Sequence, residues 1–452
     1  MQSDLSAKID NYVAYEASPP LADGTESIWS LFFSRSLHSG IASIFDQAVV
    51  SATNFATMLI IARLCTKDEL GVYYLAWTLV LFIVAVQGNL ISVPYTIYCS
   101  RREGQSLAAY AGSTLVHQLL TSALAIFFIL ILTIMFLFGL GPPALQSVGW
   151  VLLGAVPFIL LREYARRFLF AHLNLSSAIV MDVSVSCIQL SGLLILAYFN
   201  LLTVPKVYVI MGVASAFSFI IWYLTNRRPI YFIPDRFIAD WRENWQFGKW
   251  ALASQLTGLS FYILPWLLAM VHSEADTGVF AAGNTLVGLA NPFIIGLCNF
   301  LTPKAAQAYV RDGNAGLSRV LRKTTIVFTV SLGSFCLMAF IAGNFLAWFA
   351  FGAKYQAAGP IIGVLSIATI LDGLGLTANN GLWAIDRPAA NFPADIAQLI
   401  FTLGAALWLV FPFGAMGIAV AIVVGRAAGT SVRWIVLRGL MYSGACQTDI
   451  AP

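Results

Sequence analysis

Charged residues are scarce in this sequence. Only 10% of its 452 residues are Asp, Glu, Lys or Arg, and 59% are hydrophobic, with a mean hydropathy of +0.81. Soluble proteins carry roughly a quarter charged residues, so this composition argues against a soluble domain and indicates lipid as the solvent. The net charge of +4 is small, and we expect no nucleic-acid partner.

Motifs for catalysis, ATP use and metal binding are also absent. The sequence contains no G-x-x-x-x-G-K-[ST] phosphate loop, no H-E-x-x-H and no G-x-S-x-G, which are patterns typical of ATP-driven proteins, zinc proteases and serine hydrolases. Its six cysteines form no C-x-x-C pair and its four histidines are dispersed, so neither a disulfide framework nor a metal site is indicated. We therefore expect no enzyme, and no cofactor other than a coupling proton or sodium ion.

Long apolar runs make up most of what is present. A helix needs about 20 apolar residues to cross the roughly 30 Å hydrocarbon core of a membrane. Twelve such runs lie at residues 41–64, 72–93, 107–140, 148–169, 176–201, 207–225, 248–271, 279–301, 324–351, 360–383, 392–413 and 414–437. The sequence therefore predicts an all-α integral membrane protein with about twelve transmembrane helices.

The distribution of Lys and Arg gives the expected orientation. Placing the N-terminus inside leaves 21 of the 25 basic residues on or toward one side of the membrane and four on the other. Those four are Arg63, Lys67, Lys206 and Lys354. Because cytosolic loops hold an excess of Lys and Arg, we expect a multi-pass protein of the plasma (inner) membrane with both termini in the cytosol.

The two halves of the chain carry faint sequence echoes. "LGVYYLA", with Gly71, corresponds to "TGVFAAG", with Gly278, and Asp182 corresponds to Asp395 at an offset of 213 residues. An offset of six helices predicts a parallel repeat, and such halves usually enclose a central site. Both aspartates lie near the predicted cytosolic starts of their helices, where we expect capping or interface roles.

This repeat predicts the domain organisation. The first 35 residues have no apolar run long enough for a signal peptide, and we interpret them as a cytosolic tail. The expected parts are the tail at 1–35, an N-terminal six-helix lobe at 36–225, a cytosolic connecting loop at 226–247, a C-terminal six-helix lobe at 248–440 and a tail at 441–452.

The first predicted span has a polar face. At 100° per residue, Asp46, Thr53, Asn54 and Thr57 fall on one side, with Gln47 flanking them. Hydroxyl residues often only mediate helix packing in membranes, whereas a carboxylate is costly there and usually faces a cavity or a cation. Two interpretations of Asp46 follow. Either it has a functional role, or its side chain simply extends to the inner membrane surface.

Charges within the other predicted spans are few. Arg162 and Glu163 could pair with each other at the cytosolic rim of the fourth span. Asp372 and Arg426 lie at similar depths in the tenth and twelfth spans, so we expect an ion pair between them, either structural or functional. His117, in the third span, is interpreted as a hydrogen-bonded packing residue.

Two stretches resemble a known family. "FDQAVVSATNFATMLIIARLCTKDELGVYYLA", residues 45–76, and "FGAKYQAAGP", residues 351–360, are similar to polysaccharide and O-antigen flippases of the multidrug/oligosaccharidyl-lipid/polysaccharide (MOP) exporter superfamily. The resemblance implies two six-helix lobes around a central cavity that opens alternately to the two membrane faces. It also implies an undecaprenyl-diphosphate-linked oligosaccharide as substrate, contact with membrane lipids, and glycan polymerases or glycosyltransferases as partners.

Such a substrate defines what the cavity must offer. It needs cations for the diphosphate, hydroxyls and amides for the glycan, and a lateral opening for the lipid tail. The candidate substrate-binding or cavity residues are Asp46, Gln47, Asn54, Thr57, Arg162, Arg166, Arg167, Lys249, Gln255, Asp372 and Arg426. Few basic residues lie at mid-membrane depth, which favours capture of the diphosphate at the basic cytosolic mouth.

Two alternatives remain open. The first is a cation-coupled multidrug exporter of the same superfamily, in which Asp46 would bind the coupling proton or sodium ion. The second is a non-transporting membrane scaffold of a glycan-assembly complex. Asp46 has no acidic counterpart in "KWALASQLTGLS" of the seventh span, which carries Lys249 and Gln255 instead. This difference favours a specific role for Asp46.

Overall fold

A computed structural model describes residues 35–442, without the side chains of residues 35–44, 254, 256, 299 and 300. The expected tails at 1–35 and 441–452 therefore lie almost wholly outside the described residues. Residues from Phe45 onward belong to one compact unit, and the side-chain contacts given below lie within it.

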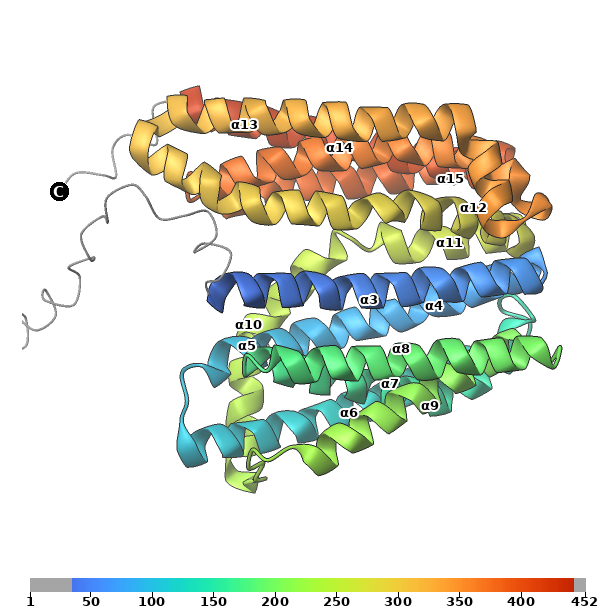
Figure 1. The fold of residues 1–452 in the computed structure, drawn as a ribbon, viewed down its shortest axis with the longest axis vertical. Coiled ribbons are helices and arrows are strands. Elements are labelled where there is room, and N and C mark those ends of the chain that lie inside the picture. Colours follow the sequence, from blue (N-terminus) through green and yellow to red (C-terminus); the bar gives the residue numbers. More distant parts are fainter. Residues whose placement is uncertain (1–34, 443–452) are drawn as a thin grey trace, which may run out of the picture. The chain divides into compact units, whose positions relative to one another are not determined.

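The regular elements of the described residues are all helices (Figure 1). The α-helices are α3 (Arg35–Leu64), α4 (Lys67–Gln87), α5 (Val93–Cys99), α6 (Gly104–Leu137), α7 (Leu145–Ala171), α8 (Leu175–Tyr198), α9 (Val204–Thr225), α10 (Pro234–Leu256), α11 (Ser260–Val271), α12 (Glu274–Val287), α13 (Asn291–Phe351), α14 (Gly359–Ala384) and α15 (Phe392–Tyr442). One π-helical turn, η1 (Gly88–Ser92), and three 3₁₀ segments, η2 (Gly288–Ala290), η3 (Ala353–Ala358) and η4 (Pro388–Asn391), connect some of them.

The described helices account for twelve crossings of a membrane. Nine continuous helical stretches within residues 45–442 are long and apolar enough to span. Two of them are interrupted by a glycine with positive φ, Gly313 in α13 and Gly414 in α15, so each contains two helices joined at a kink. The shorter apolar helix α11 supplies the remaining crossing. The chain is thus a multi-pass, all-helical membrane protein, as predicted.

Consecutive crossings define two ends of the bundle. The end that holds the connections at residues 100–103, 172–174, 226–233 and 385–391 is called the basic end, and the other is called the opposite end. Arg63, Lys67, Lys206 and Lys354 all lie near the opposite end. The basic end is the one that the sequence predicts to be cytosolic.

The connection between the halves differs from the expected one. The segment at 226–247, expected to be a loop, is helical from Pro234, since proline at a first helical position followed by an acidic residue favours helix initiation. The seventh span, expected to be continuous over 248–271, is broken between α10 and α11 at residues 257–259. Gly258 lies in this break, and its N–H donates to the Gln255 carbonyl at 3.0 Å, which closes a turn in place of a helical bond.

The backbone carries the internal repeat as well. Three helix ends in the N-terminal half have a residue with positive φ, and each has a counterpart with positive φ in the C-terminal half, 213 or 214 positions later. These φ angles lie between +52° and +95°. The pairs are Gly139 with Gly352, Leu173 with Asp386, and Asn200 with Gly414. Because positive φ is uncommon outside glycine, and especially so for leucine, the match of Leu173 with Asp386 is stronger support for related halves than short apolar words are.

The two halves meet where α4 and α12 begin, at the opposite end. Thr66 and Ser273 cap these helices, each accepting a hydrogen bond of 3.1 Å from the backbone N–H three residues later. One turn further, a Cβ on Gly71 would lie 1.8 Å from the Glu274 carbonyl oxygen, and one on Gly278 would lie 2.2 Å from that of Lys67. Only glycine fits either position, so the two backbones are in direct contact.

Two cations reinforce this meeting point. Arg63, at the end of α3, donates from Nε to the Ala350 carbonyl at 2.8 Å, near the end of α13. Lys354, in η3, donates in return to the Cys65 carbonyl, after α3. Each cation meets the carbonyl end of a helix, where positive charge is favourable. Cys65 is buried beside these contacts, and burial raises the pKa of its thiol to about 11.

Replacing Gly71 with alanine should therefore loosen the opposite end. We expect Gly71→Ala to lower stability by about 1–3 kcal/mol, the usual cost of overpacking, and to speed reaction of Cys65 with a maleimide, because thiols react as exposed thiolates. Thermal unfolding in detergent and the labelling rate of a variant with Cys65 as its only cysteine measure the two effects. Gly154→Ala is the control, since nothing lies within 4 Å of a Cβ there; equal behaviour of the two variants would contradict the assignment.

Candidate functional site

The polar face of α3 divides into two sectors. Asp46, Thr53 and Thr57 are buried, with Asp46 2% exposed and Thr57 fully enclosed. Asn54, on the same face, and Gln47, on its flank, are exposed. The sequence correctly predicts a polar face, but the structure turns part of it toward α7 and α8 and leaves the two amides uncovered.

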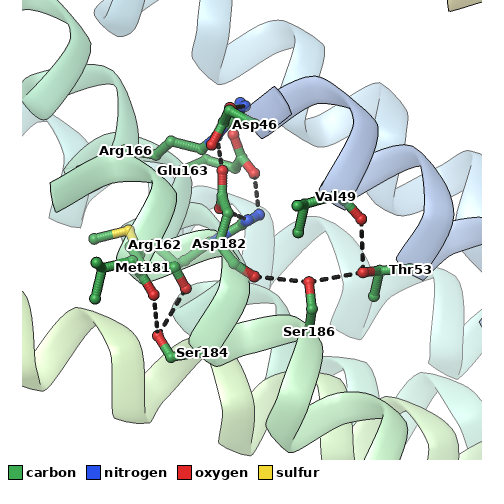
Figure 2. A network of polar contacts seen from close by, with 11 residues as sticks. Asp46, Val49, Thr53, Arg162, Glu163, Arg166, Met181, Asp182, Ser184 and Ser186 are labelled. Carbon is green, nitrogen blue, oxygen red and sulfur yellow. Dashed lines mark hydrogen bonds and ion pairs between the residues drawn. The ribbon is translucent and has the colours of Figure 1, made fainter. Parts of the chain in front are cut away.

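Hydroxyls and amides join α3 to α8. Thr53 Oγ1 donates to Ser186 Oγ at 2.7 Å, and Ser186 Oγ donates in turn to the Asp182 carbonyl at 2.7 Å (Figure 2). Further along, Gln189 Nε2 donates to Thr57 Oγ1 at 2.8 Å. Thr53 and Thr57 therefore mediate packing between helices, as polar residues do in membranes.

A charged cluster lies at the end of this polar seam nearer the basic end. Arg166 of α7 pairs with Asp46 of α3 through Nη2 and with Asp182 of α8 through Nε, the latter at 2.5 Å. Arg162, one turn earlier, pairs with the other oxygen of Asp182 and with Glu163. Figure 2 shows these side chains converging between the three helices. Asp182, whose side chain is fully enclosed, is the shared partner of both arginines.

The cluster contains more acid than base. Three carboxylates, from Asp46, Glu163 and Asp182, meet two guanidinium groups. Asp46 Oδ1 is buried and lacks a hydrogen-bond partner among the described residues. Buried charges are stable only when paired, so the cluster has the charge and the open acceptor to take up one proton.

A second pair lies in the C-terminal half. Arg426 Nη1 of α15 is 2.8 Å from Asp372 Oδ1 of α14, which confirms the predicted ion pair. Both side chains remain partly open, 38% and 30% exposed. About two turns closer to the basic end, Arg433 pairs with Asp395 across the two helices of α15.

The two repeated aspartates thus serve interfaces. Asp182 is the eighth residue of α8, too far along to cap it, and Asn174 is the N-cap instead. The expected interface role is confirmed by its ion pairs with α7, and the capping alternative is wrong for this residue. Asp395 lies in the first turn of α15 and also pairs with Arg433.

The remaining candidates are separate from these clusters. Arg167 is exposed on α7. Lys249 is exposed on α10, with Nζ 5.6 Å from the centre of the Trp250 ring. Gln255 Nε2 donates to Tyr262 Oη at 3.1 Å across the break between α10 and α11. The structure therefore does not bring all the sequence candidates into one site.

Several residues of the seam were not among the sequence candidates. Asp182, Ser186 and Gln189 are spaced by four and three residues, which places them on one face of α8. Asp46, Thr53 and Thr57, spaced by seven and four residues, form a similar one-sided stripe on α3, and comparing polar stripes between spans could have paired the two helices. Among the described residues, no group of three or more His, Cys, Asp or Glu side chains is arranged to hold a metal ion.

Solved structures with the same architecture give the class of fold. No protein-family model and no curated protein matches the sequence. An inward-facing multidrug resistance MATE family transporter of the MOP superfamily matches with a TM-score of 0.74 and 16% identity, over 89% of this chain and 96% of that one. The chain therefore has the fold of these proteins, about twelve transmembrane helices in two lobes, and the predicted fold class is confirmed.

Two further structures refine the comparison. The inward closed conformation of the lipid II flippase MurJ matches with a TM-score of 0.70 and 14% identity, over 89% of this chain and 87% of that one. An outward-facing MATE family transporter matches with a TM-score of 0.62 and 14% identity, over 90% and 95%. Both structures therefore support the same fold.

The charged cluster predicts an order of mutational effects. Asp182→Asn should cost about 3–5 kcal/mol, since it leaves two buried arginines without their shared partner. Asp46→Asn should lower the free energy of unfolding by less, because two carboxylates still balance the two guanidinium groups. Asp395→Asn should lower it least, because the Asp395 side chain is 26% exposed and exposed ion pairs contribute little to stability. Thermal unfolding of the three purified variants tests this order, and a small loss for Asp182→Asn would contradict the central place given to that residue.

Proposed function

We propose that this protein is a membrane transporter, a flippase that moves a polyprenyl-diphosphate-linked oligosaccharide from the cytosolic to the outer leaflet by alternating access. The product would serve the assembly of a surface polysaccharide or O-antigen, with glycan polymerases or glycosyltransferases as partners. The observation that carries the proposal is the partly open ion pair of Arg426 and Asp372 within the spans.

The position of this pair explains why it matters. Arg426 lies twelve residues after Gly414, about 18 Å along the helix by rise, and so near the middle of the span. A charged pair at that depth is costly against lipid and normally faces protein or a water-filled passage. Protein leaves 38% of the Arg426 side chain uncovered. Because exposure of this charge to lipid would be costly, we infer a polar passage beside α14 and α15.

Other exposed polar groups suit the same substrate. Gln47 and Asn54 on α3 are uncovered amides and would contact the glycan, while Arg426 would exchange Asp372 for a diphosphate oxygen. Arg167, exposed at the basic-end part of α7, would contribute to the first capture of the diphosphate. Arg162 and Arg166 are held by carboxylates, so we assign them to the lobe's interior and away from the substrate.

The conformation fits the first stage of such a cycle. The contact of Gly71 and Gly278 holds the opposite end together. If the basic end is cytosolic, as the positive-inside rule predicts, the protein would be ready to accept a substrate assembled in the cytosol. The next step would require separation of α4 from α12.

Translocation of a fluorescent polyprenyl-diphosphate oligosaccharide in vesicles tests the proposal. We expect the reconstituted protein to make the glycan accessible to an outside glycosidase faster than protein-free vesicles do. Arg426→Ala should reduce the rate at least about tenfold, the equivalent of 1.4 kcal/mol, since its charge lies inside the span. Arg438→Ala, where the guanidinium lies 5.7 Å from the Trp434 ring near the helix end, is the matched control. Absence of translocation in properly folded samples would leave only the scaffold or exporter alternatives.

A second candidate function is supported by the charged cluster of α3, α7 and α8. Its surplus carboxylate and the unpartnered Asp46 Oδ1 suit a site that binds a proton, as a cation-coupled multidrug exporter would require. The TM-score of 0.74 to a MATE family transporter is compatible with this activity.

Efflux of a cationic dye from vesicles under an imposed proton or sodium gradient distinguishes the two candidates. If the protein is a coupled exporter, the gradient should drive efflux, and Asp46→Asn should abolish that dependence because the surplus carboxylate is gone. Gln47→Glu, one residue along on the exposed flank of α3, is a control that adds a carboxylate outside the cluster. Gradient-independent behaviour of the unmodified protein would rule the coupled exporter out.

A further inference from the structure

The polarity of α10 is inverted. Its buried residues include Asp240, 2% exposed, and Asn244, fully enclosed. Several of its large apolar side chains are exposed: Ile238 at 59%, Trp245 at 44% and Trp250 at 72%. In a helix that lies on a protein in water, the apolar side faces the protein, so the outer side of α10 requires a different environment.

Polar contacts hold the inner side of α10 against the start of α6. Arg102, just before α6, pairs with Asp240 at 3.3 Å and with Glu243. Tyr110 Oη donates to Asn244 Oδ1 at 2.7 Å. The backbone is equally close, since a Cβ on Gly112 would lie 2.1 Å from the carbonyl oxygen of Tyr231, just before α10. The inner side of α10 is therefore fully occupied by this lobe.

A second set of contacts extends this docking. His117 Nε2 lies 3.1 Å from the Phe237 carbonyl, and its ring lies 5.2 Å from that of Trp241. His117 is thus a hydrogen-bonded packing residue, as the sequence suggests. Arg236 Nη1 donates to Ser106 Oγ at 3.3 Å. Figure 1 shows α10 crossing α5 and α6 near the basic end, where most other helices run along one another.

The outer side of α10 combines aromatic and basic residues. At 3.6 residues per turn, Ile238, Arg242, Trp245 and Lys249 fall within about 60° of one another, on the side away from Asp240 and Asn244. Arg242 and Lys249 are exposed, and the rings of Trp241 and Trp245 stack with centres 6.3 Å apart. Helices that lie at a membrane surface typically combine tryptophan with Lys or Arg in this way.

We propose that the outer side of α10 binds anionic phospholipid headgroups of the leaflet at the basic end. Ile238 and Trp245 enter the boundary of the acyl chains, while Arg242 and Lys249 contact the phosphates. This assignment gives Lys249 a lipid partner in place of a transported substrate, and it holds whichever substrate the protein carries.

Charge decides between an anionic and a neutral lipid. The acidic residues close to the two cations along the helix, Asp240 and Glu243, are both paired with Arg102. The nearest acidic residue of the outer side is Asp235, in the first turn, two turns from Arg242. A surface with uncompensated cations attracts anionic headgroups by about 1 kcal/mol per cation, or about fivefold each.

Titration with defined lipids, followed by native mass spectrometry of the full chain in detergent, tests the assignment. We expect tighter retention of phosphatidylglycerol than of phosphatidylcholine, and the double variant Arg242→Gln/Lys249→Gln should weaken phosphatidylglycerol binding about 25-fold. Trp245→Ser, which leaves both cations in place, should weaken retention of both lipids. All three positions are exposed, so thermal unfolding of the variants should match the unmodified protein.

Arg322→Gln/Lys323→Gln is the matched control. These two cations are also exposed and lie near the basic end, in α13, but their segment, "RVLRKTT", has no aromatic residue. The control should retain phosphatidylglycerol. An equal loss in both double variants, or equal retention of the two lipids by the unmodified protein, would overturn the proposal. So would unchanged phosphatidylglycerol binding after Arg242→Gln/Lys249→Gln, which would leave this surface for a protein partner.

Discussion

Placing charge inside an apolar bundle requires a partner for each charge, and the N-terminal lobe is organised by this requirement. Asp182 accepts from both Arg162 and Arg166, and Arg166 reaches on to Asp46. The consecutive helices α7 and α8 are thereby fixed at one level with α3, which lies about 100 positions earlier, and the hydroxyl contacts of Thr53 and Ser186 follow from that register. Alternative registers would leave a buried arginine unpaired, which costs several kcal/mol.

The two halves share a backbone plan but differ in chemistry. Capping residues, helix ends with positive φ and the glycines at the meeting of α4 and α12 all recur. The charges do not: Asp182 pairs with α7, whereas its counterpart Asp395 pairs with Arg433 in the twelfth crossing. A repeated scaffold with unlike interiors allows one lobe to hold an ion while the other contacts a substrate, and this division fits both candidate functions.

Sequence patterns predict the elements well because hydrophobic length and charge asymmetry are local properties. The twelve crossings, the helical class and the pairing of Asp372 with Arg426 follow from them. The rotation of α3 could not be predicted, since the face that holds Asp46 could turn toward a passage or toward α8 with equal local cost. The break at Gly258 was also missed, because a glycine within an apolar run gives no sign of whether tertiary contacts will favour a turn.

The docking of α10 bears on how the chain is made. Its polar inner residues, Asp240 and Asn244, have their partners in Arg102 and Tyr110, more than 130 positions earlier in the sequence. During synthesis those partners emerge first, and domains generally fold as units in that order. The completed N-terminal lobe would then act as a template on which α10 settles at the membrane surface, setting the direction in which α11 enters. A defect at Tyr110 would consequently appear as misinsertion of the second half of the protein.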